Sequence, residues 1–238
     1  MPEWFEEWFG EEYLHLYPHR DEADADRIVA LLRRALPWRE GWRVLDVACG
    51  AGRHLAALER AGAVPFGFDL SAALLRRARR VTGRPLVRAD MRGIPFRPRS
   101  MDLTVNLFTS FGYFAADEEH TDALGQMLAT VRPEGWFVID FLNAEHVRAS
   151  LIPHELTSYG GIDVEIRREV TGDRRFVRKS IRVADGRRFE ERVRLLGADD
   201  LERMITAHGA RLVERYGDYG GAPLSGGTRT ILIARVTG

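Results

Sequence analysis

The sequence almost lacks cysteine, since Cys49 is the only one among 238 residues. A single cysteine excludes an internal disulfide framework and any zinc site built from several cysteines. An excess of charge is also missing, because 35 basic residues balance 35 acidic residues. Proteins that bind nucleic-acid phosphates or anionic membrane surfaces carry a basic excess as a rule. We therefore expect neither nucleic acid nor a membrane among the partners of this protein.

Long apolar runs are absent as well, and no stretch approaches the roughly 20 apolar residues that a transmembrane helix requires. The N-terminus is acidic, whereas a secretory signal begins with basic residues. The histidines include no H-E-x-x-H pair, so no metal is predicted. Together with a length that suits a single domain, these absences predict a cytoplasmic protein, which we expect to be a monomer or a homodimer.

The most informative segment runs from Val44 to Leu55 and has the pattern of a strand, a turn and the start of a helix. Where a strand turns tightly into a helix against a ligand, glycine is needed because a Cβ would block the approach. Gly50 and Gly52 meet this need. The dinucleotide fingerprint G-x-G-x-x-G requires a third small residue where this chain has Leu55. A ligand without a pyrophosphate is therefore favoured.

Polar residues follow three later predicted strands. Asp69 ends the second strand, 19 positions after Gly50, a spacing at which a carboxylate can accept both hydroxyls of a ribose. Asp90 and Met91 follow the third strand and suit an adenine, because the acid accepts from the amine and the thioether lies on the ring. Asn106 ends the fourth strand. With these motifs in this order, the sequence resembles the class I S-adenosylmethionine-dependent methyltransferases of the small-molecule type.

The resemblance implies S-adenosyl-L-methionine as the cofactor. In that family the glycine loop holds the methionine part, and the acids after the second and third strands hold the ribose and the adenine amine. Asp46 has two open roles, which are to bond the backbone of its own turn or to orient the cofactor amino group through water. Asp69 has the alternative of capping the next helix, which Ser71 can also do. The predicted cofactor-binding residues are Tyr17, Arg20, Asp46, Ala48, Gly50, Gly52, Arg53, Asp69, Leu70, Asp90, Met91, Asn106, Leu107 and Phe108.

The methyl acceptor is predicted to be a small molecule. The run Asn106–Thr109 lacks the Asn/Asp-Pro-Pro-aromatic motif typical of enzymes that methylate the amines of bases, and Cys49 lies in the cofactor loop rather than beside an acceptor. Nitrogen and oxygen acceptors are both open, and Tyr113 is the one candidate for a catalytic base. Aromatic walls would favour an apolar or cationic acceptor. The predicted pocket residues are Tyr13, Phe111, Tyr113, Phe114, Tyr216 and Tyr219.

The predicted fold is α/β, with a Rossmann-like, seven-stranded, mainly parallel sheet flanked by helices and an antiparallel last strand. After the fifth strand, apolar and charged residues alternate between turn sequences, which predicts an antiparallel three-stranded β insert. The insert strands are expected at 162–166, 176–183 and 189–195. We expect a single methyltransferase domain with an N-terminal helical lid segment at 1–36, a cofactor-binding core at 37–155, the β insert at 156–197, and a C-terminal helix and last two strands at 198–238.

Aromatic residues recur at helical spacing within residues 1–20, as in the pair Trp4 and Trp8. This stripe either packs a helix on the domain or forms a lid, with Tyr17 and Arg20 at the methionine carboxylate of the cofactor. Two other functions stay open beside methyl transfer. They are a non-catalytic adenosylmethionine-binding or partner-binding protein and, less favoured, a nicotinamide-dependent oxidoreductase.

Overall fold

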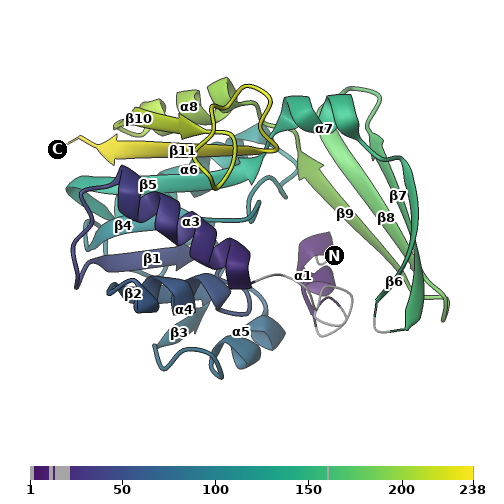
Figure 1. The fold of residues 1–238 in the computed structure, drawn as a ribbon, viewed down its shortest axis with the longest axis horizontal. Helices are drawn as coiled ribbons and strands as arrows, with labels where there is room; N and C mark the ends of the chain where they lie inside the picture. The colour runs from purple at the N-terminus through teal and green to yellow at the C-terminus, as the bar shows by residue number, and fades with distance from the viewer. Residues whose placement is uncertain (1–2, 11–12, 14–21, 160, 238) are drawn as a thin grey trace.

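Apolar strands that alternate with amphipathic helices produce a seven-stranded sheet in the computed structural model (Figure 1). The structure describes residues 3–10, 13, 22–159 and 161–237. The strand order is β10-β11-β5-β4-β1-β2-β3, and β11 runs opposite to the other six strands. The mainly parallel sheet with an antiparallel last strand is confirmed. The strands are β1 (Arg43–Val47), β2 (Val64–Asp69), β3 (Leu86–Arg88), β4 (Met101–Asn106), β5 (Val131–Leu142), β10 (Ala210–Tyr216) and β11 (Arg229–Val236).

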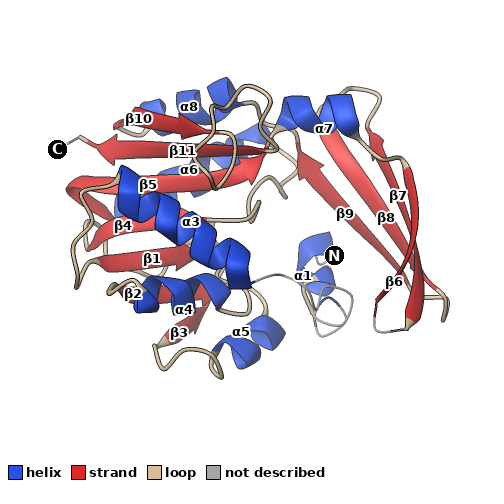
Figure 2. Cartoon of the chain, viewed as in Figure 1, coloured by secondary structure: helices blue, strands red, loops and turns tan. Residues whose placement is uncertain are grey.

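Helices cover both faces of this sheet (Figure 2). Successive side chains of a strand point to opposite faces, so Val44 joins one apolar core and Leu45 joins the other. The first face carries α3 and α4, and the second carries α6 and α8. None of the helices in the described part of the chain is both long and apolar enough to cross a membrane. The helices that follow α1 (Trp4–Trp8) in the structure are α3 (Glu22–Ala35), α4 (Arg53–Arg60), α5 (Ala72–Ala78), α6 (Asp117–Thr130), α7 (Ala144–Ser150) and α8 (Ala198–Ala207).

The order of the strands determines where a ligand can bind. The chain adds β2 and β3 on one side of β1, and β4 then pairs with the other side of β1. After β1 the chain therefore continues to β2 on one side, whereas after β4 it continues to β5 on the other side. In open α/β sheets, ligands bind in the crevice at such a reversal, at the carboxyl ends of the strands.

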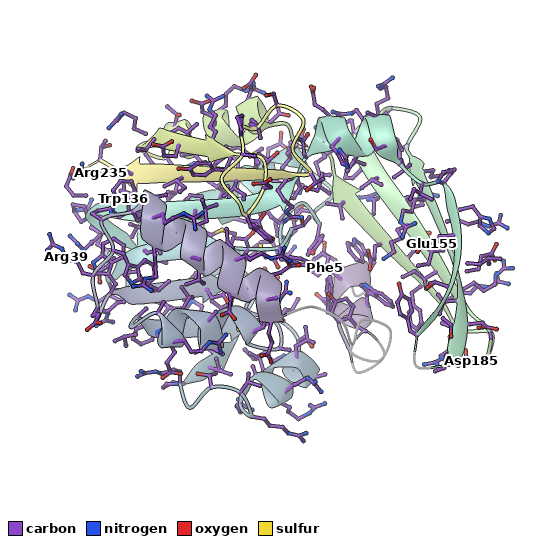
Figure 3. The ribbon with its side chains drawn as sticks, in the orientation of Figure 1. Phe5, Arg39, Trp136, Glu155, Asp185 and Arg235 are labelled. Carbon is purple, nitrogen blue, oxygen red and sulfur yellow. The ribbon has the colours of Figure 1, made fainter. Side chains whose placement is uncertain are left out.

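A second, antiparallel sheet follows β5 and contains four strands in the order β6-β7-β8-β9, so the prediction of three strands is wrong. The additional edge strand, β6 (His154–Tyr159), has no buried side chain, and Leu156 is 75% exposed. Leu156 is its one aliphatic residue, so the strand lacks the alternation of apolar and charged residues that identifies the other three in the sequence. Glu155 lies opposite the buried Ile166, on the inner side of this sheet at its edge, and pairs with Arg168 (Figure 3). Charged side chains such as Glu165, which pairs with Arg182, cover the outer side. The remaining strands are β7 (Ile162–Val170), β8 (Phe176–Val183) and β9 (Arg188–Arg194).

The N-terminal helix α1 (Trp4–Trp8) lies between the two sheets (Figure 1). Trp8 packs on the inner face of the small sheet, and its indole N–H donates a hydrogen bond to Oε1 of Glu191 at 2.8 Å. Phe5, on the same helix, belongs to the core of the large sheet. Helix α1 therefore connects the two sheets. Phe9 and Tyr13 of the predicted aromatic stripe also pack together, whereas Tyr17 lies outside the described residues.

Candidate functional site

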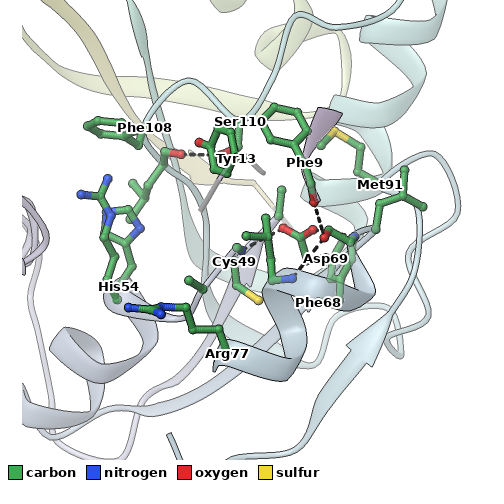
Figure 4. Close-up of a pocket in the computed structure, with 18 of the residues that line it drawn as sticks. Phe9, Tyr13, Cys49, His54, Phe68, Asp69, Arg77, Met91, Phe108 and Ser110 are labelled. Carbon is green, nitrogen blue, oxygen red and sulfur yellow. Dashed lines mark hydrogen bonds between the residues drawn. The ribbon is translucent and has the colours of Figure 1, made fainter. Parts of the chain in front are cut away.

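A cavity of about 730 Å³ lies at the carboxyl edge of the large sheet, where β1, β2, β3 and β4 end (Figure 4). Four loops of the sheet and the N-terminal aromatics line it. Such a volume suits a small-molecule ligand. The structure therefore brings together segments that the sequence predicted to share one site. Among the predicted residues, the lining contains Ala48, Gly50, Arg53, Asp69, Leu70, Asp90, Met91, Leu107, Phe108, Tyr13, Tyr113 and Phe114.

The glycine loop turns through left-handed backbone torsions at Ala48, Gly50 and Gly52, whose φ angles are 57°, 54° and 86°. Glycine adopts this region without a steric cost, whereas Ala48 is strained there, as residues at ligand sites often are. Gly52 has a second constraint, because a Cβ would lie 3.0 Å from the side chains of Ala78 and Val81. The loop therefore packs closely on α5 and leaves no room for a larger residue.

Asp69 is buried directly beneath this loop. Its Oδ2 accepts the N–H of Gly50 and its Oδ1 accepts the N–H of Ser71, both at 2.8 Å. Burial raises the pKa of the carboxyl, and the two N–H groups oppose this rise. Ser71 caps α5, with its hydroxyl accepting the N–H of Leu74 at 3.1 Å, so Asp69 is not the helix cap. A carboxylate has about four acceptor positions, which leaves Asp69 able to accept further donors from a ligand.

Asp46 lies behind the glycine loop, 1% exposed and outside the cavity lining. Its Oδ2 has no hydrogen-bond partner within the described part of the chain. Burial raises the pKa of this carboxyl to about 8, and the nearby charge of Asp69 adds to the rise while Arg53 opposes it. Near neutral pH the group therefore carries a proton for most of the time. Both roles that the sequence left open for Asp46 remain predictions.

Asp90 is engaged by a single arginine. The Arg92 guanidinium donates to Oδ2 of Asp90 at 2.6 Å, and its backbone N–H donates to Oδ1 at 2.8 Å. Burial raises the pKa of Asp90, but the hydrogen bonds from Arg92 outweigh it and lower the pKa below its ordinary value. Arg92 also pairs with Glu3, beside α1, and with Glu119 of α6. No sequence motif marked Arg92, and an adenine amine at Asp90 would share the carboxylate with it.

A second group of lining residues is aromatic and comes from residues 5–13 and 113–114; we call it the aromatic end of the cavity. The Tyr113 ring lies 5.2 Å from Trp4 and 5.5 Å from Phe9, measured between ring centroids, and Phe5 packs edge-on against Phe114. The Tyr113 hydroxyl donates to the carbonyl of Thr109 at 2.6 Å. To act as a base, Tyr113 would first have to lose the hydroxyl proton that it donates to this carbonyl.

Several residues that the sequence predicted for the site do not line the cavity. Phe111 is completely buried in the core, because its ring packs against Phe141 and His120 below the turn. Tyr216 packs with the α3 side of the sheet, because the loop after β10 passes over that helix. Neither of them lines the cavity. Tyr17 and Arg20 lie outside the described residues, and Gly52 and Asn106 lie behind the cavity wall, where Asn106 donates to the carbonyls of Val47 and Ser110.

Tyr219 lies in a second hollow, of about 800 Å³, which shares Phe108 with the first cavity. Its hydroxyl donates to Oδ2 of Asp140 at 2.8 Å, and Arg229 donates to Oδ1 of the same carboxylate at 2.8 Å. One signal in the sequence could have located this group, since an acid such as Asp140 inside an apolar strand requires a partner. Among the described residues, no three His, Cys, Asp or Glu side chains converge as metal ligands.

The central part of the chain matches known methyltransferases in sequence. A family model described as a methyltransferase domain matches residues 44–135. A dTDP-3-amino-3,6-dideoxy-alpha-D-glucopyranose N,N-dimethyltransferase of Streptomyces fradiae is 36% identical over 123 residues, which are 51% of this chain and 46% of that protein. The corresponding dTDP-3-amino-3,4,6-trideoxy sugar enzyme of Streptomyces venezuelae is 33% identical over 50% of this chain and 49% of its own length. The match therefore spans about half the length of these curated relatives.

Solved structures match over nearly the whole chain. The CcbJ methyltransferase of Streptomyces caelestis superposes with a TM-score of 0.81 at 19% identity, covering 98% of this chain and 99% of the other. An S-adenosylmethionine-dependent methyltransferase of Clostridium acetobutylicum reaches 0.79 at 18% identity, covering 96% and 99%. At such identities the likeness establishes the fold alone.

Proposed function

We propose that this chain is a class I S-adenosylmethionine-dependent methyltransferase and that it transfers a methyl group from this cofactor to a nitrogen of a small molecule. The observation that carries the proposal is one cavity whose lining contains two unlike groups of residues. Backbone and carboxylate groups around Asp69 form one end, and aromatic rings around Tyr113 form the other. The first suits the polar cofactor and the second suits an acceptor.

The residues of the cavity fit the cofactor chemically. Asp69 retains acceptor positions for ribose hydroxyls, and Met91 lies beside Asp90 where an adenine ring would be held. When bound, S-adenosylmethionine supplies an already activated methyl group. The protein then contributes mainly placement, since holding donor and acceptor in line removes much of the entropic part of the barrier.

A nitrogen acceptor is favoured over an oxygen acceptor by the state of Tyr113. Its hydroxyl proton is committed to the Thr109 carbonyl, which leaves this residue poorly prepared to deprotonate an alcohol. An amine needs only to lose its ammonium proton before it attacks, and water can take that proton. The faces of aromatic rings also attract an ammonium group. The two curated relatives are named as N,N-dimethyltransferases of amino sugars, which supports the same choice of atom.

The experiment is a transfer assay with isotopically labelled S-adenosylmethionine and paired acceptors. Each pair consists of an amino sugar, free or linked to a nucleoside diphosphate, and the same sugar with a hydroxyl in place of the amine. We expect labelled product from amines alone, lost in the Asp69→Ala variant. Product from the hydroxyl members alone would contradict the nitrogen assignment, and failure of the wild-type protein to bind the cofactor would contradict the proposal as a whole.

A further inference from the structure

The cavity wall after β4 contains two successive residues in a strained conformation. Phe108 and Thr109 have φ angles of 59° and 61°, in the left-handed region that side chains rarely adopt. Such strain persists only where the surrounding structure holds it. Leu107, Phe108 and Ser110 of this turn line the cavity. The shape of the wall therefore depends on what keeps this turn in place.

Asp140, at the carboxyl end of β5, receives the backbone N–H groups of both strained residues. The Phe108 N–H donates to Oδ2 of Asp140 at 2.9 Å, and the Thr109 N–H donates to the Asp140 carbonyl at 2.9 Å. Asp140 is completely buried, so these bonds are protected from competition with water. One residue thus satisfies the two donors that the left-handed turn directs inward.

Two side chains from distant parts of the chain hold Asp140 in turn. Arg229, the first residue of β11, donates to Oδ1, and Tyr219, in the loop before β11, donates to Oδ2. Burial, and then the charge of Asp140, raise the pKa of the Tyr219 phenol, so its hydroxyl stays protonated and remains a donor. Arg229 also lies over the ring of Phe108, 5.5 Å from its centroid.

We propose that Asp140 is a positioning residue of the methyltransferase site. It holds the turn at Phe108 and Thr109 in its left-handed form and so fixes the wall of the cavity, while Tyr219 and Arg229 fix Asp140. This inference rests on the proposed function, because it takes the cavity as the cofactor site. It assigns Tyr219 a supporting role behind the wall in place of the predicted role in the acceptor pocket.

The first test compares Asp140→Asn with a matched control, Asp102→Asn. Asp102, near the amino end of β4, makes the same two kinds of contact, accepting the Arg43 N–H at 2.8 Å and Nε of Arg132 at 2.6 Å. We expect Asp140→Asn to weaken the binding of S-adenosylhomocysteine, measured by calorimetry, by about tenfold or more. We expect Asp102→Asn to change that affinity by less than about twofold while it lowers stability.

The second test separates positioning from a general loss of structure. Thr109→Gly relieves the backbone strain at this position, because glycine adopts the left-handed region freely. The substitution breaks no hydrogen bond of the Thr109 hydroxyl, because Oγ1 is buried without a hydrogen-bond partner in the described structure. Added to Asp140→Asn, it should restore most of the lost affinity. If Asp140→Asn does not fold, Tyr219→Phe, with an expected loss of about threefold, is tested with the same rescue.

Three results would overturn the inference. They are wild-type affinity in Asp140→Asn, an equal loss in Asp102→Asn, and no rescue by Thr109→Gly. The proposed function fails separately, because it fails if the wild-type protein does not bind S-adenosylhomocysteine. In that case the inference falls with it, whereas normal binding by the wild type and by Asp140→Asn contradicts the role of Asp140 alone.

Discussion

The two ends of the cavity are built in different ways. The end around Asp69 is held by hydrogen bonds between neighbouring strand ends, from the Gly50 N–H to the Asp69 carboxylate and from the Cys49 N–H to the Phe68 carbonyl. The aromatic end depends on helix α1 and on the turn after β4, which side chains from distant segments hold in place. The first end is therefore a property of the sheet itself, and the second a property of long-range packing.

The largest effect should come from the backbone of the sheet-built end. In Gly52→Val, the new side chain meets α5 and the left-handed φ of 86° becomes strained. We expect the free energy of unfolding to fall by about 3 kcal/mol, measured by urea denaturation. Gly83→Val is the control, because a Cβ at Gly83 meets no atom within 4 Å. Equal losses in the two variants would contradict a tight approach at Gly52.

The second prediction compares the two ends directly. Asp69→Ala should weaken the binding of S-adenosylhomocysteine by about 2 kcal/mol, because it removes the ribose acceptor and strands the N–H groups of Gly50 and Ser71. Phe5→Ala, at the aromatic end, should weaken it by less than about 1 kcal/mol. Calorimetry measures both affinities. A larger loss in Phe5→Ala would reverse the assignment of the two ends.

The third prediction concerns pH at the sheet-built end. Burial raises the pKa of Asp46 from its ordinary 3.8 to about 8, so between these values the folded state holds a proton that the unfolded chain has lost. Stability should therefore fall as the pH rises through this window, by at most about 1.4 kcal/mol per pH unit. Asp46→Asn lacks this contribution and should show a flatter dependence in urea denaturation. Identical slopes would mean that Asp46 does not titrate in this window.

The smallest effect is expected at the aromatic end. Tyr113→Phe keeps the ring and removes the hydrogen bond to Thr109, which should cost about 1 kcal/mol of stability. With an amine acceptor, kcat should fall less than tenfold, since a lost general base would cost about a hundredfold or more. A loss of that size would identify Tyr113 as the base.

The same division explains how much the sequence predicted. The glycine turn and the acids after β2 and β3 could be located because strand periodicity fixes which residues reach the carboxyl edge. Edge strand β6 was not predicted because, with Leu156 as its one aliphatic residue, it lacks the alternation of apolar and charged residues seen in the other three strands. Tyr219 and Phe111 were misplaced because a loop path and a core position depend on tertiary packing, which residue type alone does not encode. Arg92 had no local motif to mark it.

The most direct measurement of the central claim is a crystal structure of the protein with S-adenosylhomocysteine. We expect the ribose hydroxyls within hydrogen-bond distance of Asp69, the adenine beside Asp90 and Met91, and the sulfur facing the aromatic end at Tyr113. A ligand bound in the second hollow beside Tyr219, or one with its ribose away from Asp69, would contradict the claim that the sheet-built end is the cofactor site.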